Sequence, residues 1–151
     1  MKLYLMRHGE ATASPQNPEQ TLTPQGRSNL EKLAGQLAQK GIRVKQVFHS
    51  EKMRARQSAE IMAIQIAPDI SLQAHSRIKP NDDPQLILDD IKQWHDDTLI
   101  VSHLPFIPGL LGLLLTSPQP SHPITFEPGT VICLSRENTS WQIEWIESPT
   151  Q

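Results

Sequence analysis

The chain has 151 residues, about the length of one ordinary domain, and we expect a single domain over residues 1–151. Hydrophobic residues make up 37% and the net charge is −2, which fits a globular protein. A general nucleic-acid-binding protein would show an excess of basic residues, so the net charge argues against that class. The longest apolar stretch, Leu104 to Leu115, contains two prolines and is too short to span a bilayer. The start of the chain lacks the apolar segment of a signal peptide, and a single cysteine, Cys133, suits a reducing compartment. We therefore expect a cytoplasmic protein.

The first forty residues predict a strand, a loop and a helix. Lys2 to Met6 is apolar enough to form a short buried strand, and the polar segment after it, EATASPQNPEQ, is rich in residues that favour turns. Thr23 is placed as an N-cap, with Pro24 at the first helical position. Apolar residues then repeat at helical spacing until Gly41, which indicates an amphipathic helix.

The middle of the chain repeats this alternation. The segment VKQVFHS predicts a second strand that ends near Ser50, and a helix is expected after it through Ile64. Four apolar residues are expected to form the inner stripe of that helix: Ala55, Ala59, Met62 and Ile66. Ile70 to Ala74 is a more weakly marked strand.

The last third of the chain contains the most clearly marked strand. Leu86 to Trp94 predicts a helix, Thr98 to His103 predicts a buried strand, and another helix should begin near Pro105. The proline-rich segment 117–123 predicts a surface connection. The segments TVICLS and SWQIEWI predict two paired strands joined around Arg136 to Thr139.

Strands that alternate with helices predict an α/β fold, a three-layer sandwich with a mainly parallel central sheet. Ligands of such sheets bind beyond the carboxyl ends of the strands. Arg7 and His8 follow the first strand, Arg54 follows the second, and His103 closes the buried strand. Arg54 also lies near the positive end of a helix dipole, where a cation is disfavoured, and such a breach of local preference is typical of functional sites. Together these groups suit a phosphate or carboxylate ligand.

Four short segments resemble the histidine phosphatase superfamily, which has the phosphoglycerate-mutase-like fold. They are, in chain order, RHGEA, LTPQG, SEKMRARQSA and VSHLP, and the match extends from Leu3 to Pro105. Each is short, so their order and structural setting carry the signal. The chain length and the SHLP form are similar to the SixA branch in particular, whose members remove phosphate from phosphohistidine in signalling proteins.

The resemblance implies a catalytic set formed by Arg7, His8, Arg54 and His103. His8 would attack phosphorus, and water would then hydrolyse the phosphohistidine formed on the enzyme. Neutral imidazole is abundant at pH 7, so a histidine nucleophile is chemically reasonable. Arg7, Arg54 and His103 would bind the phosphate, and Gly9 would let the backbone turn sharply or approach it closely. The resemblance implies no metal and no cofactor, because charge stabilisation comes from the arginines and His103.

The alternative to Arg54 as the pocket arginine is Arg56. In the segment RARQS, Arg54 matches the position of the family's phosphate-binding arginine, which favours Arg54. The other histidines have no comparable setting, and we interpret them as surface or packing residues: His49, His75, His95 and His122. No pair of them has metal-ligand spacing together with a convincing third ligand.

A proton donor is not assigned by the sequence. Many members of the superfamily carry a glutamate after the third strand, and the matching region, HSRIKPNDDP, has none. Glu10, Asp82 and Asp83 are candidates, but ordinary loop carboxylates and turn chemistry explain them equally well.

The sequence therefore predicts a metal-independent phosphohistidine phosphatase acting on a signalling protein. The expected partner is a phosphorylated protein, a histidine phosphotransfer domain above all, with no nucleic acid and no membrane, and a monomer is favoured. The alternatives are a small-molecule phosphatase or mutase acting on sugar phosphates, and a phosphate-binding module without turnover. The intact set of Arg7, His8, Arg54 and His103 argues against the module, because a binder needs no nucleophile.

Overall fold

A mixed sheet forms the centre of the protein, whose computed structural model describes residues 1–115 and 124–149. Four strands run parallel: β1 (Lys2–Arg7), β4 (Gln46–His49), β5 (Leu72–Ala74) and β6 (Thr98–Ser102). Two more form an antiparallel hairpin at one side: β7 (Val131–Glu137) and β8 (Ser140–Glu147). The strand order is β5-β4-β6-β1-β7-β8. This arrangement confirms the prediction of an α/β fold with a mainly parallel sheet.

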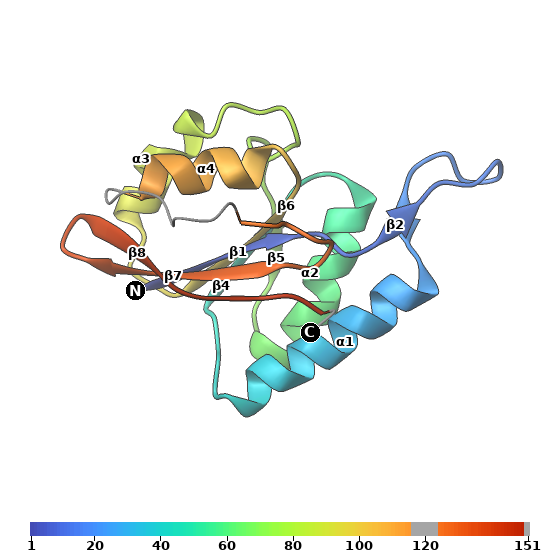
Figure 1. Cartoon of the computed structure of the whole chain (residues 1–151), viewed down its shortest axis with the longest axis horizontal. Helices are drawn as coiled ribbons and strands as arrows, with labels where there is room; N and C mark the ends of the chain where they lie inside the picture. The colour runs from blue at the N-terminus through green and yellow to red at the C-terminus, as the bar shows by residue number, and fades with distance from the viewer. Residues whose placement is uncertain (116–123, 150–151) are drawn as a thin grey trace.

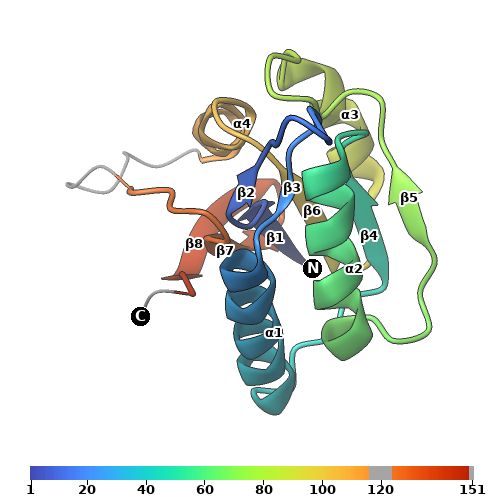
Figure 2. The same ribbon diagram turned by 90° about the vertical axis from the view of Figure 1, so that its right-hand side faces the viewer.

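Two helices pack on each face of the sheet and complete three layers (Figures 1 and 2). One face carries α1 (Pro24–Gln39) and α2 (Met53–Ile66), and the other carries α3 (Gln85–Gln93) and α4 (Phe106–Leu114). Strand β1 serves both cores because successive side chains of a strand point to opposite faces. Its Tyr4 and Met6 join the first core, and Leu3 and Leu5 join the second. This double burial explains why the central residues of β1 and β6 form continuous apolar runs rather than alternating with polar residues.

Helix α1 begins and ends as the sequence predicts. The Thr23 hydroxyl accepts a hydrogen bond from the Gly26 amide at 2.9 Å, and Pro24 occupies the first turn. Gly41 follows the helix with φ of +82°, a conformation that favours glycine. The buried stripe predicted for α2 is also confirmed at all four positions.

The segment after β1 differs from the predicted loop. It contains two short antiparallel strands, β2 (Ala11–Thr12) and β3 (Thr21–Leu22), at the base of an arm that projects from the body (Figure 1). Two-residue strands carry no periodic pattern, so sequence reasoning could not find them. The backbone amide of Leu22 donates to the Gln57 side chain at 2.9 Å and so attaches the arm to α2.

Three further structural points bear on the predictions. Most predicted boundaries fall within one or two residues of those observed, as expected for element ends. The predicted connection at 117–123 lies outside the described residues. No helix of the described part is long and apolar enough to cross a membrane.

Candidate active site

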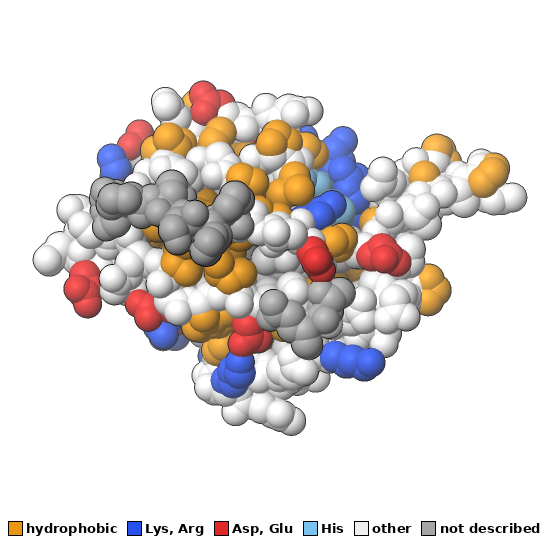
Figure 3. All heavy atoms as spheres, in the orientation of Figure 1, with side chains coloured by type: hydrophobic (Ala, Val, Ile, Leu, Met, Phe, Trp, Pro, Cys, Tyr) orange, Lys and Arg blue, Asp and Glu red, His pale blue; other side chains and the backbone are white. Residues whose placement is uncertain are grey.

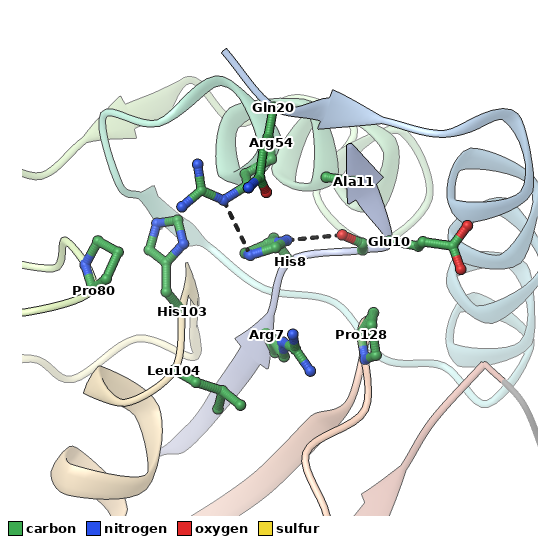
Figure 4. Close-up of a pocket in the computed structure, with 11 residues that line it drawn as sticks. Arg7, His8, Glu10, Ala11, Gln20, Arg54, Pro80, His103, Leu104 and Pro128 are labelled. Carbon is green, nitrogen blue, oxygen red and sulfur yellow. Dashed lines mark hydrogen bonds between the residues drawn. The ribbon is translucent and has the colours of Figure 1, made fainter. Parts of the chain in front are cut away.

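The ends of β1, β4 and β6 meet at one edge of the sheet. Arg7 pairs with Ser102 across β1 and β6, and His49 pairs with Val101 across β4 and β6. A cavity of about 250 Å³ opens at this edge (Figure 4). The residues predicted to form the catalytic set line it: Arg7, His8, Arg54 and His103. In Figure 3, basic and histidine side chains meet in a hollow at the base of the arm.

The ring of His8 is held in a defined orientation at this edge. Its Nδ1 lies 2.8 Å from the Gly9 carbonyl oxygen, which can only accept a hydrogen bond, so we assign the hydrogen to Nδ1. The other nitrogen, Nε2, then carries a lone pair and accepts from Arg54 Nε at 3.3 Å. The tautomer therefore presents a nucleophilic nitrogen beside a guanidinium group.

Arg7 is anchored on one side only. Its terminal nitrogen donates to the Phe126 carbonyl at 2.6 Å. Its Nε is buried and has no hydrogen-bond partner among the described residues. A buried donor of this kind costs free energy unless a ligand satisfies it. Arg7 is thus placed to donate to an anion in the cavity.

Arg54, rather than Arg56, reaches the cavity from α2. In Figure 4, the Arg54 side chain extends into the cavity, and a dashed line joins its Nε to His8. The side chain of Arg56 is 60% exposed and pairs with Glu60 at 3.6 Å on the outer surface. Arg54 therefore lies in the cavity and Arg56 on the surface, as the resemblance to the family implies.

His103 lies against the His8 ring from the neighbouring strand. The two ring centroids are 5.0 Å apart in an edge-on arrangement. His103 Nε2 is 2.6 Å from the Ser50 hydroxyl oxygen, and Nδ1 is buried without a partner among the described residues. One ring nitrogen is thus fixed by the protein and the other is left for a ligand.

Burial and neighbouring cations keep both rings neutral at pH 7. Burial lowers the pKa of His8 to about 4, with a smaller contribution from Arg54 and Arg7, although the bond to the Gly9 carbonyl acts in the opposite direction. Burial also lowers the pKa of His103 to about 3, and His8 is the next largest cause. A bound anion would offset these shifts, because negative charge favours imidazolium.

Gly9 organises the site through its backbone. Its carbonyl accepts from His8, and its amide donates to the Ser58 hydroxyl at 2.9 Å, so both backbone groups are used within the protein. A Cβ at this position would lie 2.8 Å from Leu30 Cδ1, so a larger residue here would require the Leu30 side chain of α1 to move.

Supporting residues missed by the sequence analysis come from the same motif as Arg54. Ser58 donates to the Arg54 carbonyl at 2.8 Å while accepting from Gly9, which joins the nucleophile loop to α2. Gln57 holds β3, as described above. Their spacing from Arg54, at i+3 and i+4, places all three on one side of a helix, and this signal was available in the sequence. Glu19 had no such signal; its carboxylate accepts from the Met53 amide at 2.9 Å.

The candidate proton donors all have partners within the protein. Glu10 lines the cavity, but its carboxylate accepts from the Thr23 hydroxyl at 2.7 Å and points away from His8 (Figure 4). Asp82 accepts from the Lys79 amide at 2.8 Å, and Asp83 accepts from the Gln85 amide at 2.9 Å. Neither aspartate is among the lining residues.

The chemistry of the lining favours an oxyanion over a metal ion. Two guanidinium groups and an unpartnered imidazole nitrogen converge on the space in front of His8 Nε2. In the described part of the chain, no group of three or more His, Cys, Asp or Glu side chains is placed to hold a metal. Tetrahedral anions such as phosphate match this donor set.

The structure resembles the solved structures of three SixA proteins. The protein histidine phosphatase SixA complexed with tungstate is 22% identical, with a TM-score of 0.87 over 99% of this chain and 98% of that one. A putative SixA from Agrobacterium tumefaciens is 20% identical, with a TM-score of 0.80 over 98% and 97% of the two chains. A putative SixA from Nakamurella multipartitia is 22% identical, with a TM-score of 0.76 over 99% and 96%. At this identity, the likeness shows the fold.

Sequence comparison gives the family. No curated protein sequence matches the chain. The family model of the histidine phosphatase superfamily (branch 1) matches residues 3–79, a span that includes His8 and Arg54. The chain therefore belongs to the histidine phosphatase superfamily.

Proposed function

We propose that this protein is a phosphatase that removes phosphate from phosphohistidine on a signalling protein, with His8 as the nucleophile. The observation that carries the proposal is the orientation of His8. Its Nδ1 is fixed to the Gly9 carbonyl, and its Nε2 faces a cavity that holds Arg54 and His103. A nucleophile whose lone pair faces phosphate-binding donors is the arrangement that phosphoryl transfer needs.

The reaction has two steps. In the first, His8 Nε2 bonds to phosphorus as the bond from phosphorus to the leaving nitrogen breaks. In the second, water bonds to phosphorus and the bond to His8 breaks, which releases inorganic phosphate. Arg7, Arg54 and His103 donate to the phosphoryl oxygens and stabilise the charge that develops on them.

The preference for phosphohistidine rests on the leaving group. A protonated phosphohistidine ring releases neutral imidazole, whose conjugate acid has a pKa near 6.5. An alkyl phosphate ester releases an alkoxide, whose basicity is close to that of hydroxide, and the conjugate acid of hydroxide has a pKa near 15.7. The gap of roughly 9 units corresponds to about 12 kcal/mol of proton affinity. Esters therefore depend more on a general acid, and the carboxylates of Glu10, Asp82 and Asp83 are engaged elsewhere.

The substrate is proposed to be a histidine phosphotransfer domain or a similar phosphorylated protein. Support comes from the likeness to SixA structures, one of which is described as a protein histidine phosphatase. The cavity of about 250 Å³ is small, which suits a single phosphorylated side chain presented by a folded partner.

A comparison of kcat/KM values tests the proposal. The substrates are a phosphorylated histidine phosphotransfer domain, a sugar phosphate and phosphoserine. We expect the phosphohistidine protein to be favoured by at least about 100-fold, because imidazole is a far less basic leaving group than an alkoxide. A higher value for the sugar phosphate would assign the protein to small-molecule metabolism. Tight vanadate binding without turnover of any substrate would identify a phosphate-binding module.

A further inference from the structure

The buried pair formed by Ser50 and His103 has features that phosphate binding alone does not require. Ser50 is fully buried, and His103 is 2% exposed. Ser50 follows β4 and His103 follows β6, and the Ser50 amide donates to the Val101 carbonyl at 3.2 Å. Two adjacent strands therefore fix both ends of the contact between the hydroxyl and the ring.

The surrounding hydrogen bonds indicate how the hydrogens are placed at rest. The Ser50 oxygen already accepts from the Lys52 amide at 3.2 Å. If its own hydrogen points to His103 Nε2, the hydroxyl is satisfied and the ring hydrogen lies on Nδ1. Nδ1 is the ring nitrogen that lacks a protein partner, and His103 faces the cavity in Figure 4. A phosphoryl oxygen that accepts a hydrogen bond from Nδ1 would give this last ring nitrogen a partner.

The Ser50 hydroxyl can also form a hydrogen bond with the protonated ring of His103. Imidazolium carries hydrogens on both nitrogens, and the Ser50 oxygen can turn from donor to acceptor for the one on Nε2. The bond from imidazolium is charge-assisted and stronger than the neutral bond that it replaces. A backbone carbonyl or an amide nitrogen in place of the hydroxyl would suit only one of the two states.

We propose that the Ser50–His103 pair carries the proton of the reaction, with His103 as the proton donor and Ser50 as its positioning residue. This inference rests on the proposed function and gives it the donor that the carboxylates do not supply. When a phosphohistidine ring arrives unprotonated, Nδ1 of the His103 imidazolium gives its proton to the leaving nitrogen as the bond to phosphorus breaks. In the second step, the attacking water gives a proton back to Nδ1, so the balance of protons is restored.

The charges around His103 set the conditions for this role. His8 faces the ring from just beyond β1. Arg54 and Lys52 act on the ring from the start of α2, and Arg7 acts on it from the end of β1. These groups oppose protonation of His103 until the phosphoryl group brings negative charge. His103 therefore becomes protonated when the substrate binds. The Ser50 hydroxyl oxygen, as hydrogen-bond acceptor, stabilises the imidazolium form of His103.

The dependence on the leaving group tests the proposal. We expect Ser50→Ala to lower kcat/KM by about 10- to 100-fold for phosphohistidine at pH 8, where the substrate ring arrives unprotonated. The loss should be within about threefold for p-nitrophenyl phosphate, whose leaving group needs no proton. Equal losses for both substrates would overturn the proposal, because a purely structural role moves both together.

Thr130→Val is the matched control. The Thr130 hydroxyl is also buried and near the same edge of the sheet, but it has no hydrogen-bond partner among the described residues. Valine keeps the shape of the side chain, so we expect both substrates to react within about twofold of the wild type. A leaving-group effect as large as that of Ser50→Ala would overturn the assignment to Ser50.

A second measurement needs no turnover and so separates this inference from the proposed function. Nitrogen NMR of the histidine rings, with inorganic phosphate bound, reports which ring nitrogens carry hydrogen. We expect both nitrogens of His103 to be protonated in the wild type near pH 6, and its apparent pKa to fall by about one unit in Ser50→Ala. A bare Nδ1 facing phosphate in the wild type would overturn the proposal even if the protein proved to be a phosphatase.

Discussion

At the scale of single residues, the site depends on the hydrogen-bond partner of each side chain. His8 presents Nε2 because the Gly9 carbonyl occupies Nδ1. Arg7 keeps a free buried donor because only its terminal nitrogen is bound, to Phe126. These bonds prepare the donors before a ligand arrives, so the protein need not reorganise them during the reaction.

Replacing Arg54 by lysine should remove most of the activity. Lysine keeps a positive charge but cannot donate in the paired, planar geometry that a guanidinium offers to phosphate oxygens. We expect kcat/KM to fall by about 100-fold. Arg56→Lys, two positions along the same helix, is the control and should stay within about twofold, because Arg56 pairs with Glu60 on the surface. Similar losses in both variants would contradict the placement of Arg54.

Stability should decrease as the pH is lowered from 7 to 5. The pKa of His8 is about 4 in the folded protein and near 6.5 in the unfolded chain, so the unfolded chain takes up the proton first. The contribution of the neutral ring is therefore complete above the unfolded pKa and is lost as the pH falls toward the folded value. For His8 the loss at pH 5 is on the order of 1–2 kcal/mol.

Urea unfolding at pH 7 and pH 5 measures this change. His8→Gln removes the titrating ring and should show a smaller decline between the two pH values. An identical decline in the variant would mean that His8 is not the source of the pH dependence.

At the scale of elements, α1 positions the loop that follows the nucleophile. A Cβ at Gly26 would lie 2.4 Å from the Glu10 carbonyl oxygen, so the first turn of α1 lies directly against the backbone two residues after His8. The Glu10 carbonyl also accepts from the Thr23 amide at 3.0 Å. Contact between the helix start and the loop thus depends on the absence of a side chain at Gly26.

Two glycines of α1 should respond in opposite ways to alanine. Gly26→Ala forces backbone apart, and we expect a loss of about 2 kcal/mol in the free energy of unfolding together with lower activity. Gly35 has no atom within 4 Å of its ideal Cβ position, so Gly35→Ala should stabilise the helix by up to about 1 kcal/mol. Denaturant unfolding and kcat/KM measure both effects. Stabilisation by Gly26→Ala would show that the loop is not held by this contact.

The sequence predicts elements well where local chemistry determines them. Thr23 and Pro24 define the start of α1 because capping and ring geometry act within a few residues. The arm formed by β2 and β3 escapes prediction because its short strands depend on a contact with Gln57 in a distant helix. Long-range support of this kind leaves no periodic signal in the segment itself.

At the scale of the whole molecule, parallel strands bring residues 7, 54 and 103 to one edge of the sheet. This convergence could be predicted, because the carboxyl ends of parallel strands meet at the same edge. The partners of these residues could not be predicted in the same way. Ser50 and His103 follow different strands, and Phe126 is far from Arg7 in sequence, so only the folded structure brings each pair into contact.

Detection of the phosphorylated enzyme tests the central claim most directly. The protein is mixed with a histidine phosphotransfer domain carrying radioactive phosphohistidine and is quenched in base within its first turnovers. We expect a label on the protein that is stable in base, lost in acid and located at His8, and no label on His8→Ala. A label of equal stoichiometry on a folded His8→Ala protein, or phosphate release by that variant at the wild-type rate, would contradict the account.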